Sequence, residues 1–130
     1  MGDYTIEDNK FNIFCERKSI SDLTGSVTSG YERFRKEFQR AKDSGGYIIV
    51  LIDGKPEQLY SSQSLPWMKN TGIKPDYILH QMRRIMSEFS ASCQFVFTGG
   101  RKESVVLLDK IFRCKRNPRE IDWQFQVKIT

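Results

Sequence analysis

The stretch Tyr47-Ile-Ile-Val-Leu-Ile-Asp53 is an uninterrupted apolar run that ends in a carboxylate. A run this short and this rich in β-branched residues is typical of a strand, and a strand that is apolar at every position is covered on both faces. Residues 93–99, "CQFVFTG", have the same character. These two segments predict buried strands of one sheet, with helices on its faces.

Helical periodicity fills the chain between and after these strands. Apolar residues at helical spacing predict a helix over residues 20–41, kinked at Gly30, and a second helix over residues 74–89 that opens with Pro75 near its first turn. A third helix is predicted over residues 101–113. Between residue 53 and the second helix lies a long loop rich in Ser, Pro and Gly that carries Trp67, and loops of this length in compact domains are often functional.

The N-terminal segments 2–7 and 10–18 alternate and are separated by Asp8-Asn9, which predicts a β-hairpin. A two-residue turn places Tyr4 opposite Ile13 and Ile6 opposite Phe11, so these apolar side chains share one face with Cys15.

The same register sends a polar set to the other face of the hairpin: Asp3, Glu16 and Lys18, together with Phe14. Asp3 lies opposite Phe14, so Glu16 is its diagonal neighbour, roughly 7–8 Å away and close enough for the two carboxylates to share an ion.

The C-terminal segment 121–129, "IDWQFQVKI", alternates apolar and polar residues and predicts an extra strand that packs against the domain or a second subunit. The whole pattern predicts an α/β fold of three layers, α/β/α, with a central mixed sheet. We expect one domain over residues 1–116 and a C-terminal extension over residues 117–130.

Composition narrows the possible functions. The net charge is +5, and cations bunch at residues 33–40, 101–102 and 113–119, which suits a polyanionic partner but is also common on solvated helix faces. The three cysteines show no C-x-x-C pairing and there is one histidine, His80, which argues against a zinc site, a disulfide frame and a histidine-based triad. No membrane span or signal peptide is visible, so we expect an intracellular protein.

Two carboxylates and a lysine at a sheet edge suit metal-assisted phosphodiester hydrolysis. Oxygen ligands favour Mg²⁺, and the lysine of such a set, here Lys18, can orient the attacking water and offset charge on the phosphate. The alternative is a solvated ion pair at a strand end, which contributes at most about 1 kcal/mol. The "GGRKES" segment, residues 99–104, favours a strand-to-helix cap over a phosphate loop, although Arg101 and Lys102 could contact DNA.

The string "GDY…ERKSISDL" resembles the signature of the XPF-type structure-specific endonuclease family, GD followed by a variable stretch and ERK-x-x-x-D. The matching residues are Gly2, Asp3, Glu16, Arg17, Lys18 and Asp22. The resemblance extends through "GSVTSGYERFRKEFQRA", the strand ending "LIDG" and "FVFTGGRKESVVLL", to about residue 114. It implies a restriction-endonuclease-like fold and Mg²⁺- or Mn²⁺-dependent cleavage of branched, forked or flapped DNA in repair, recombination or phage DNA processing.

The resemblance also implies residue roles. Asp3 and Glu16 would be metal ligands with the backbone carbonyl of Arg17 as a third, Lys18 would be the catalytic lysine, and Asp22 would brace Arg17 or Lys18 by an ion pair. Apart from the resemblance, the cations that we expect to contact DNA are Arg17, which alternation sends to the opposite face from Glu16 and Lys18, together with Arg33, Arg101 and Lys102.

Relatives usually have a further strand and helix before GD, so the chain is expected to be an N-terminally short member. A match to the nuclease core without an accessory domain resembles bacterial or phage members. The apolar tail segment and the Met-rich helix over residues 78–89 favour a homodimer. The alternative is a catalytically inactive nuclease-like module that binds DNA or a protein partner.

Overall fold

The computed structural model describes residues 4–5, 10–60 and 73–129. Its elements, in chain order, are β1 (Tyr4–Thr5), β2 (Ile13–Ser19), α1 (Ile20–Val27), α2 (Tyr31–Asp43), β3 (Tyr47–Asp53), η1 (Pro56–Tyr60), α3 (Pro75–Glu88), β4 (Cys93–Phe97), α4 (Arg101–Arg113), η3 (Pro118–Glu120) and α5 (Trp123–Ile129). In this described part, no helix is long and apolar enough to cross a membrane.

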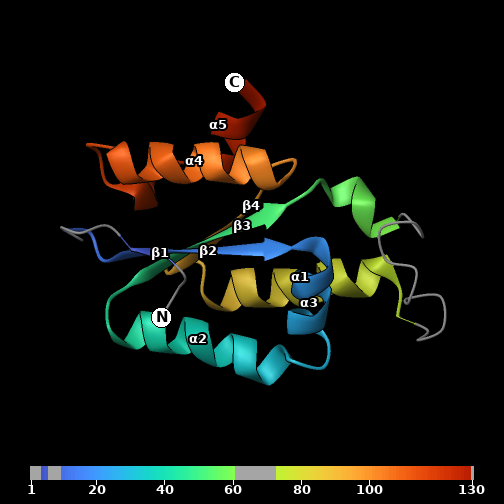
Figure 1. Ribbon diagram of the computed structural model, residues 1–130. Coiled ribbons are helices and arrows are strands. Elements are labelled where there is room, and N and C mark those ends of the chain that lie inside the picture. The colour runs from blue at the N-terminus through green and yellow to red at the C-terminus, as the bar shows by residue number, and fades with distance from the viewer. Residues whose placement is uncertain (1–3, 6–9, 61–72, 130) are drawn as a thin grey trace.

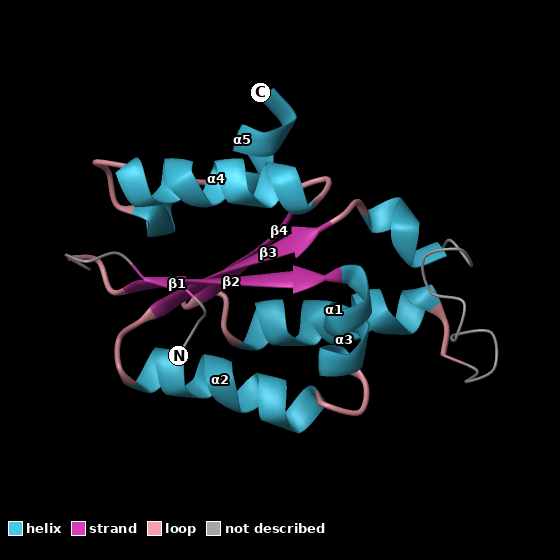
Figure 2. Ribbon diagram, in the orientation of Figure 1, coloured by secondary structure: helices cyan, strands magenta, loops and turns pink. Residues whose placement is uncertain are grey.

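The strands form one mixed sheet in the order β1-β2-β3-β4. β1 pairs antiparallel with β2, whereas β2, β3 and β4 are parallel neighbours. Both parallel crossovers step in the same direction across the sheet, and their common handedness places α1, α2 and α3 on one face. α4 and α5 cover the other face (Figures 1 and 2). The predicted three-layer α/β/α fold with a mixed sheet is confirmed.

Each face of the sheet has its own core. Alternate residues of β3 divide between them: Ile48, Val50 and Ile52 pack against α1, α2 and α3, whereas Ile49 and Leu51 pack against α4 and α5. All five side chains have no exposed surface. Burying a side chain of this size stabilises the fold by about 1.5–3 kcal/mol, so β3 is the main hydrophobic anchor, as its sequence predicted.

The hairpin is present, but its predicted register is wrong by two residues. Tyr4 pairs with Cys15, and Thr5 with Phe14, rather than Tyr4 with Ile13. Asn12 has a φ of 56°, and β2 begins only after it, so the connection exceeds two residues. The Asp8-Asn9 turn lies outside the described residues. A shift of two residues keeps every side chain on its predicted face.

The predicted helix over residues 20–41 is two helices, α1 and α2, broken at residues 28–30. A β-carbon on Gly30 would lie 3.1 Å from the carbonyl oxygen of Gly25, and the Gly30 amide donates to that same oxygen. The chain therefore needs glycine here to turn closely against the end of α1. Of the predicted long loop, residues 56–60 form η1, and Trp67 lies outside the described residues.

The predicted C-terminal strand is wrong, because the segment forms the helix α5. The backbone amide of Phe125 donates to Asp122 Oδ1 at 3.1 Å, which satisfies an amide of the first helical turn. Trp123 and Val127, four residues apart, pack on the core beside α4, whereas Phe125 is 56% exposed. These two core contacts recur at helical spacing, so the segment folds as a helix although its apolar and polar residues alternate.

Candidate functional site

The carboxyl ends of the three parallel strands meet at one edge of the sheet. Lys18 is in register with Ile52, and Ser19 with Asp53. The backbone amide of Thr98, just after β4, donates to the carbonyl of Ile52 at 3.0 Å. Side chains that leave the ends of β2 and β3 therefore gather there with the start of α4.

Glu16 and Lys18 form an ion pair on the face of β2 that looks toward α1 and α2. Lys18 Nζ lies 3.5 Å from Glu16 Oε1, and the two side chains are only 15% and 11% exposed. The ammonium also lies 5.1 Å from the centroid of the Phe34 ring, a cation–π distance. The predicted shared face of Glu16 and Lys18 is confirmed, and the pair is largely shielded from water.

Arg17 points to the opposite face, toward α4. Its Nε donates to Asp53 Oδ2 at 3.1 Å, and Ser104 Oγ donates to the other oxygen of that carboxylate at 2.5 Å. Ser104 Oγ is in turn 2.6 Å from Thr98 Oγ1. This network joins the ends of β2, β3 and β4 to α4, and so fixes the backbone that carries Glu16 and Lys18.

Asp22 lies in the first turn of α1, where its backbone amide donates to the N-cap Ser19 Oγ at 3.0 Å. Among the described residues, no ion pair joins Asp22 to Arg17 or Lys18. Arg17 pairs instead with Asp53 at the end of the neighbouring strand. The predicted bracing role of Asp22 therefore falls to Asp53 in this structure.

A polar cavity of about 500 Å³ opens beside Lys18, between α1 and α2. Its lining includes Arg33, Asp22, Glu37 and the hydroxyls of Ser21, Ser26 and Ser29. The structure thus brings Arg33 and Asp22 to the same hollow as the Lys18 ammonium.

Of the remaining predicted site residues, two lie at the start of α4 and one lies outside the described residues. Arg101 and Lys102 occupy the first turn of α4, three and two residues before Ser104. They therefore lie on the α4 side of the same sheet edge. Asp3 lies outside the described residues. Asp53 was not predicted as an ion-pair partner, although its position at the end of the central strand places it at the edge where the parallel strands end.

The comparison with curated proteins and the comparison with solved structures each found no match. The ERCC4 domain model, in contrast, matches residues 1–111, which include both strands of the hairpin and nearly all of α4. This match confirms the resemblance carried by the GD and ERK motifs. The chain belongs to the ERCC4 domain family, whose members are nucleases of restriction-endonuclease-like fold that act on branched DNA.

Proposed function

We propose that this chain is a Mg²⁺- or Mn²⁺-dependent DNA endonuclease domain that hydrolyses phosphodiester bonds in branched, forked or flapped DNA. The observation that carries the proposal is the shielded Glu16–Lys18 pair, with a 3.5 Å separation, at the carboxyl end of β2. Burying two charges costs free energy even when they are paired. Such a cost is common where the charges perform chemistry.

The proposed metal ligands are the carboxylates of Asp3 and Glu16 and the backbone carbonyl of Arg17. Nucleases of this family depend on divalent metal ions, and oxygen donors of this kind suit Mg²⁺ or Mn²⁺. In the described part of the chain, no three His, Cys, Asp or Glu residues gather as a metal site. Asp3 directly precedes Tyr4, whose partner Cys15 directly precedes Glu16.

When bound, the metal would polarise the phosphate and lower the pKa of an attacking water. Lys18 would place its ammonium beside Glu16 and the phosphate, offset the charge that develops on the phosphate oxygens, and orient the water. The face of the Phe34 ring contacts the Lys18 ammonium through a cation–π interaction and holds it in this position. Arg17 would hold the strand end through Asp53 on the α4 face, whereas Arg33, beside Lys18, would contact DNA.

The test is cleavage of a labelled forked DNA with Mg²⁺ by wild type, Asp3→Asn and Glu16→Gln. We expect each variant to lose at least about 100-fold in rate, a typical loss for the removal of a group that stabilises the transition state. Asp109→Asn, the same carboxylate-to-amide change at an exposed position of α4 on the other face of the sheet, should cut like wild type.

If Glu16→Gln cleaves as fast as wild type, the proposed assignment of the catalytic site is wrong. If wild type binds the fork but does not cut it, and calorimetry shows no Mn²⁺ binding, the chain is an inactive DNA-binding module.

We also propose a homodimer. The C-terminal strand that first suggested it is absent, but an open groove of about 710 Å³ runs along α3 and β4, lined by Met82, Met86 and Phe97 among others. Met86 is 41% exposed there. Light scattering that gives a monomer mass at high protein concentration would refute the dimer.

A further inference from the structure

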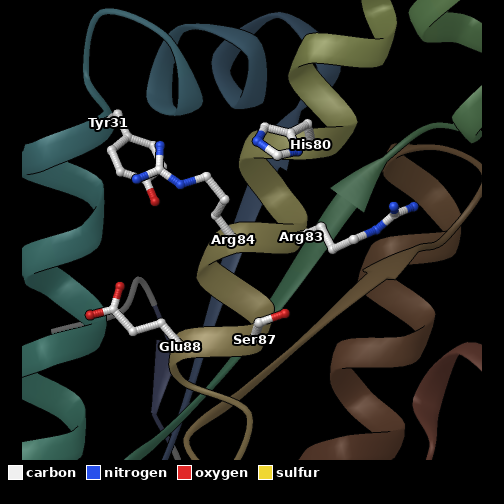
Figure 3. Close-up of a pocket in the computed structure, with 6 residues that line it drawn as sticks. All are labelled: Tyr31, His80, Arg83, Arg84, Ser87 and Glu88. Atoms are coloured by element: carbon white, nitrogen blue, oxygen red, sulfur yellow. The ribbon is translucent and has the colours of Figure 1, made fainter.

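A second cavity, of about 510 Å³, lies between α2 and α3 and has no assigned role. It is lined by Tyr31, His80, Arg83, Arg84, Ser87 and Glu88. In Figure 3, Arg84 reaches from α3 across to the Tyr31 ring, whereas Arg83 extends from the other side of the same helix. Arg84 is therefore the cation that enters the space between the two helices.

The guanidinium of Arg84 is held in place from two sides. Its carbon lies 4.8 Å from the centroid of the Tyr31 ring, and Nη1 donates to Gln81 Oε1 at 3.0 Å. Gln81 is itself 4% exposed, and its Nε2 donates at 3.2 Å to the carbonyl of Val27 in the last turn of α1. That carbonyl has no partner within its own helix. The need to satisfy it fixes the Gln81 amide, which in turn fixes Arg84.

The negative charge of Glu88, the acidic residue of this cavity, is already balanced by a cation. Glu88 forms a two-pronged ion pair with Arg35 of α2, in which Arg35 Nε lies 2.9 Å from Glu88 Oε1 and Nη2 contacts Oε2. This pairing lowers the pKa of Glu88, so the carboxylate stays charged and stays with Arg35. Among the described residues, no ion pair engages Arg84. The cavity therefore presents net positive charge with hydrogen-bond donors to spare.

The cavity adjoins the proposed cleavage site. Tyr31 follows Gly30, which lines the Lys18 cavity together with Arg33. Along the axis of α2, Tyr31 and Arg33 are about 3 Å apart by helix geometry. The two cavities therefore open on either side of the first turn of α2. A chain of phosphates that leaves Lys18 would meet Arg33 and then Arg84.

We propose that the α2–α3 cavity is a phosphodiester subsite, in which Arg84 holds a phosphate of the single-stranded DNA arm that leaves the cleavage site. The fixed guanidinium offers several N–H donors to phosphate oxygens at little further cost in side-chain entropy. His80 and Ser87 line the same space and add polar groups beside that phosphate. The inference rests on the proposed nuclease function for the position of the strand, but its test does not need cleavage.

The test is fluorescence anisotropy with a labelled forked DNA in EDTA, which prevents metal-dependent cleavage. We expect Arg84→Gln to weaken binding about 3- to 10-fold and to reduce the slope of log affinity against log salt by about 1. Arg84→Lys should recover less than half of the loss, because lysine cannot keep both the Tyr31 stack and the Gln81 bond. Arg113→Gln, the same charge change on α4, should bind like wild type. Thermal melts of each variant check folding.

The subsite is wrong if Arg84→Gln binds within about twofold of Arg113→Gln, or if Arg84→Lys binds as tightly as wild type. If wild type cuts the fork while Arg84→Gln binds normally, the nuclease assignment stands and the subsite falls. If wild type does not cut while Arg84→Gln binds weakly, the subsite stands and the nuclease assignment falls. A wild type that does not bind the fork overturns the subsite.

Discussion

The Arg17–Asp53 ion pair gives the sharpest test of how this fold positions its site. The Arg17 and Asp53 side chains are 22% and 13% exposed, so the pair is shielded more than a surface salt bridge. Asp53→Asn removes the negative charge 3.1 Å from Arg17 Nε but keeps an oxygen that can accept from Ser104. A hydrogen bond between charged groups in such a setting contributes about 1.5–3 kcal/mol, so we expect a loss of about 2 kcal/mol in the free energy of unfolding.

Urea unfolding followed by circular dichroism measures this loss, and thermal melting should show Tm lowered by about 6–10 °C for a domain of this size. The matched control is Asp109→Asn. It breaks an ion pair of 2.9 Å within α4, but there the side chains are 80% and 61% exposed. An exposed i,i+4 pair contributes about 0.3–0.5 kcal/mol, so this variant should melt almost like wild type.

Equal destabilisation by Asp53→Asn and Asp109→Asn would refute the reasoning, because it would mean that solvent screens the Arg17–Asp53 pair as fully as the surface pair. A double-mutant cycle with Arg17→Gln isolates the coupling, which we expect to be about 1–2 kcal/mol. Because the pair fixes the strand end beside Glu16, Asp53→Asn should also slow cleavage of forked DNA under conditions in which the variant remains folded.

Burial raises the pKa of the Cys15 and Cys93 thiols to about 12. In native protein a thiol reagent should therefore modify the half-buried Cys114 first. Since each buried thiol ionises at a higher pH when folded, its contribution to stability is complete below its ordinary pKa of 9.0 and is lost as pH rises toward about 12. Urea midpoints should therefore fall between about pH 8.5 and about pH 10.5, because in this range the thiols of the unfolded chain ionise and those of the folded chain do not. A flat profile would contradict this. Gln124→Leu should cost about 1–2 kcal/mol in a urea titration, because the Gln124 amide bonds both the N–H and the carbonyl of Phe97 on the edge of β4; an unchanged midpoint would mean that water replaces both bonds.

The sequence predicted the faces of the hairpin better than its register. An even shift of register leaves Glu16 and Lys18 on the face that alternation predicts for them, so the register error of two residues did not affect that prediction. The register itself depended on where β2 begins. Asn12 adopts a positive φ that ends the extended backbone, and nothing in the period-two pattern signals it.

The C-terminal helix shows where periodicity is ambiguous. Trp123 and Val127 are four residues apart, which fits a helix as well as a strand, and the choice depended on Phe125. The alternating pattern predicts that Phe125 is buried, but it lies exposed. Its neighbour Gln124 instead bonds the free edge of β4. That use of a glutamine depends on tertiary placement, which the sequence pattern does not contain.

Asp53, the ion-pair partner of Arg17, could not be predicted from the sequence for a related reason. Arg17 and Asp53 are 36 positions apart, and Ser104 is a further 51 along the chain. The three meet only because β2 and β3 end, and α4 begins, at one edge of the sheet. A motif-based prediction looks for partners within the motif, which is why it favoured Asp22. The structure shows that the ERK triplet depends on the central strand as well as on its own helix.

The three charged residues in sequence at the end of β2 raise a physical problem that the fold solves by alternation. A strand end that carries a carboxylate and two cations would be costly to bury if all three faced one side. Strand geometry sends Arg17 to one face, where Asp53 meets its charge, and sends Glu16 and Lys18 to the other, where they meet each other. Because the Arg17 side is locked by Asp53 and Ser104, the strand end cannot turn without breaking that network. The rigidity of one face therefore fixes the geometry of the proposed chemistry on the other. This coupling is why we expect a change at Asp53, which does not lie on the Glu16 face, to reduce cleavage.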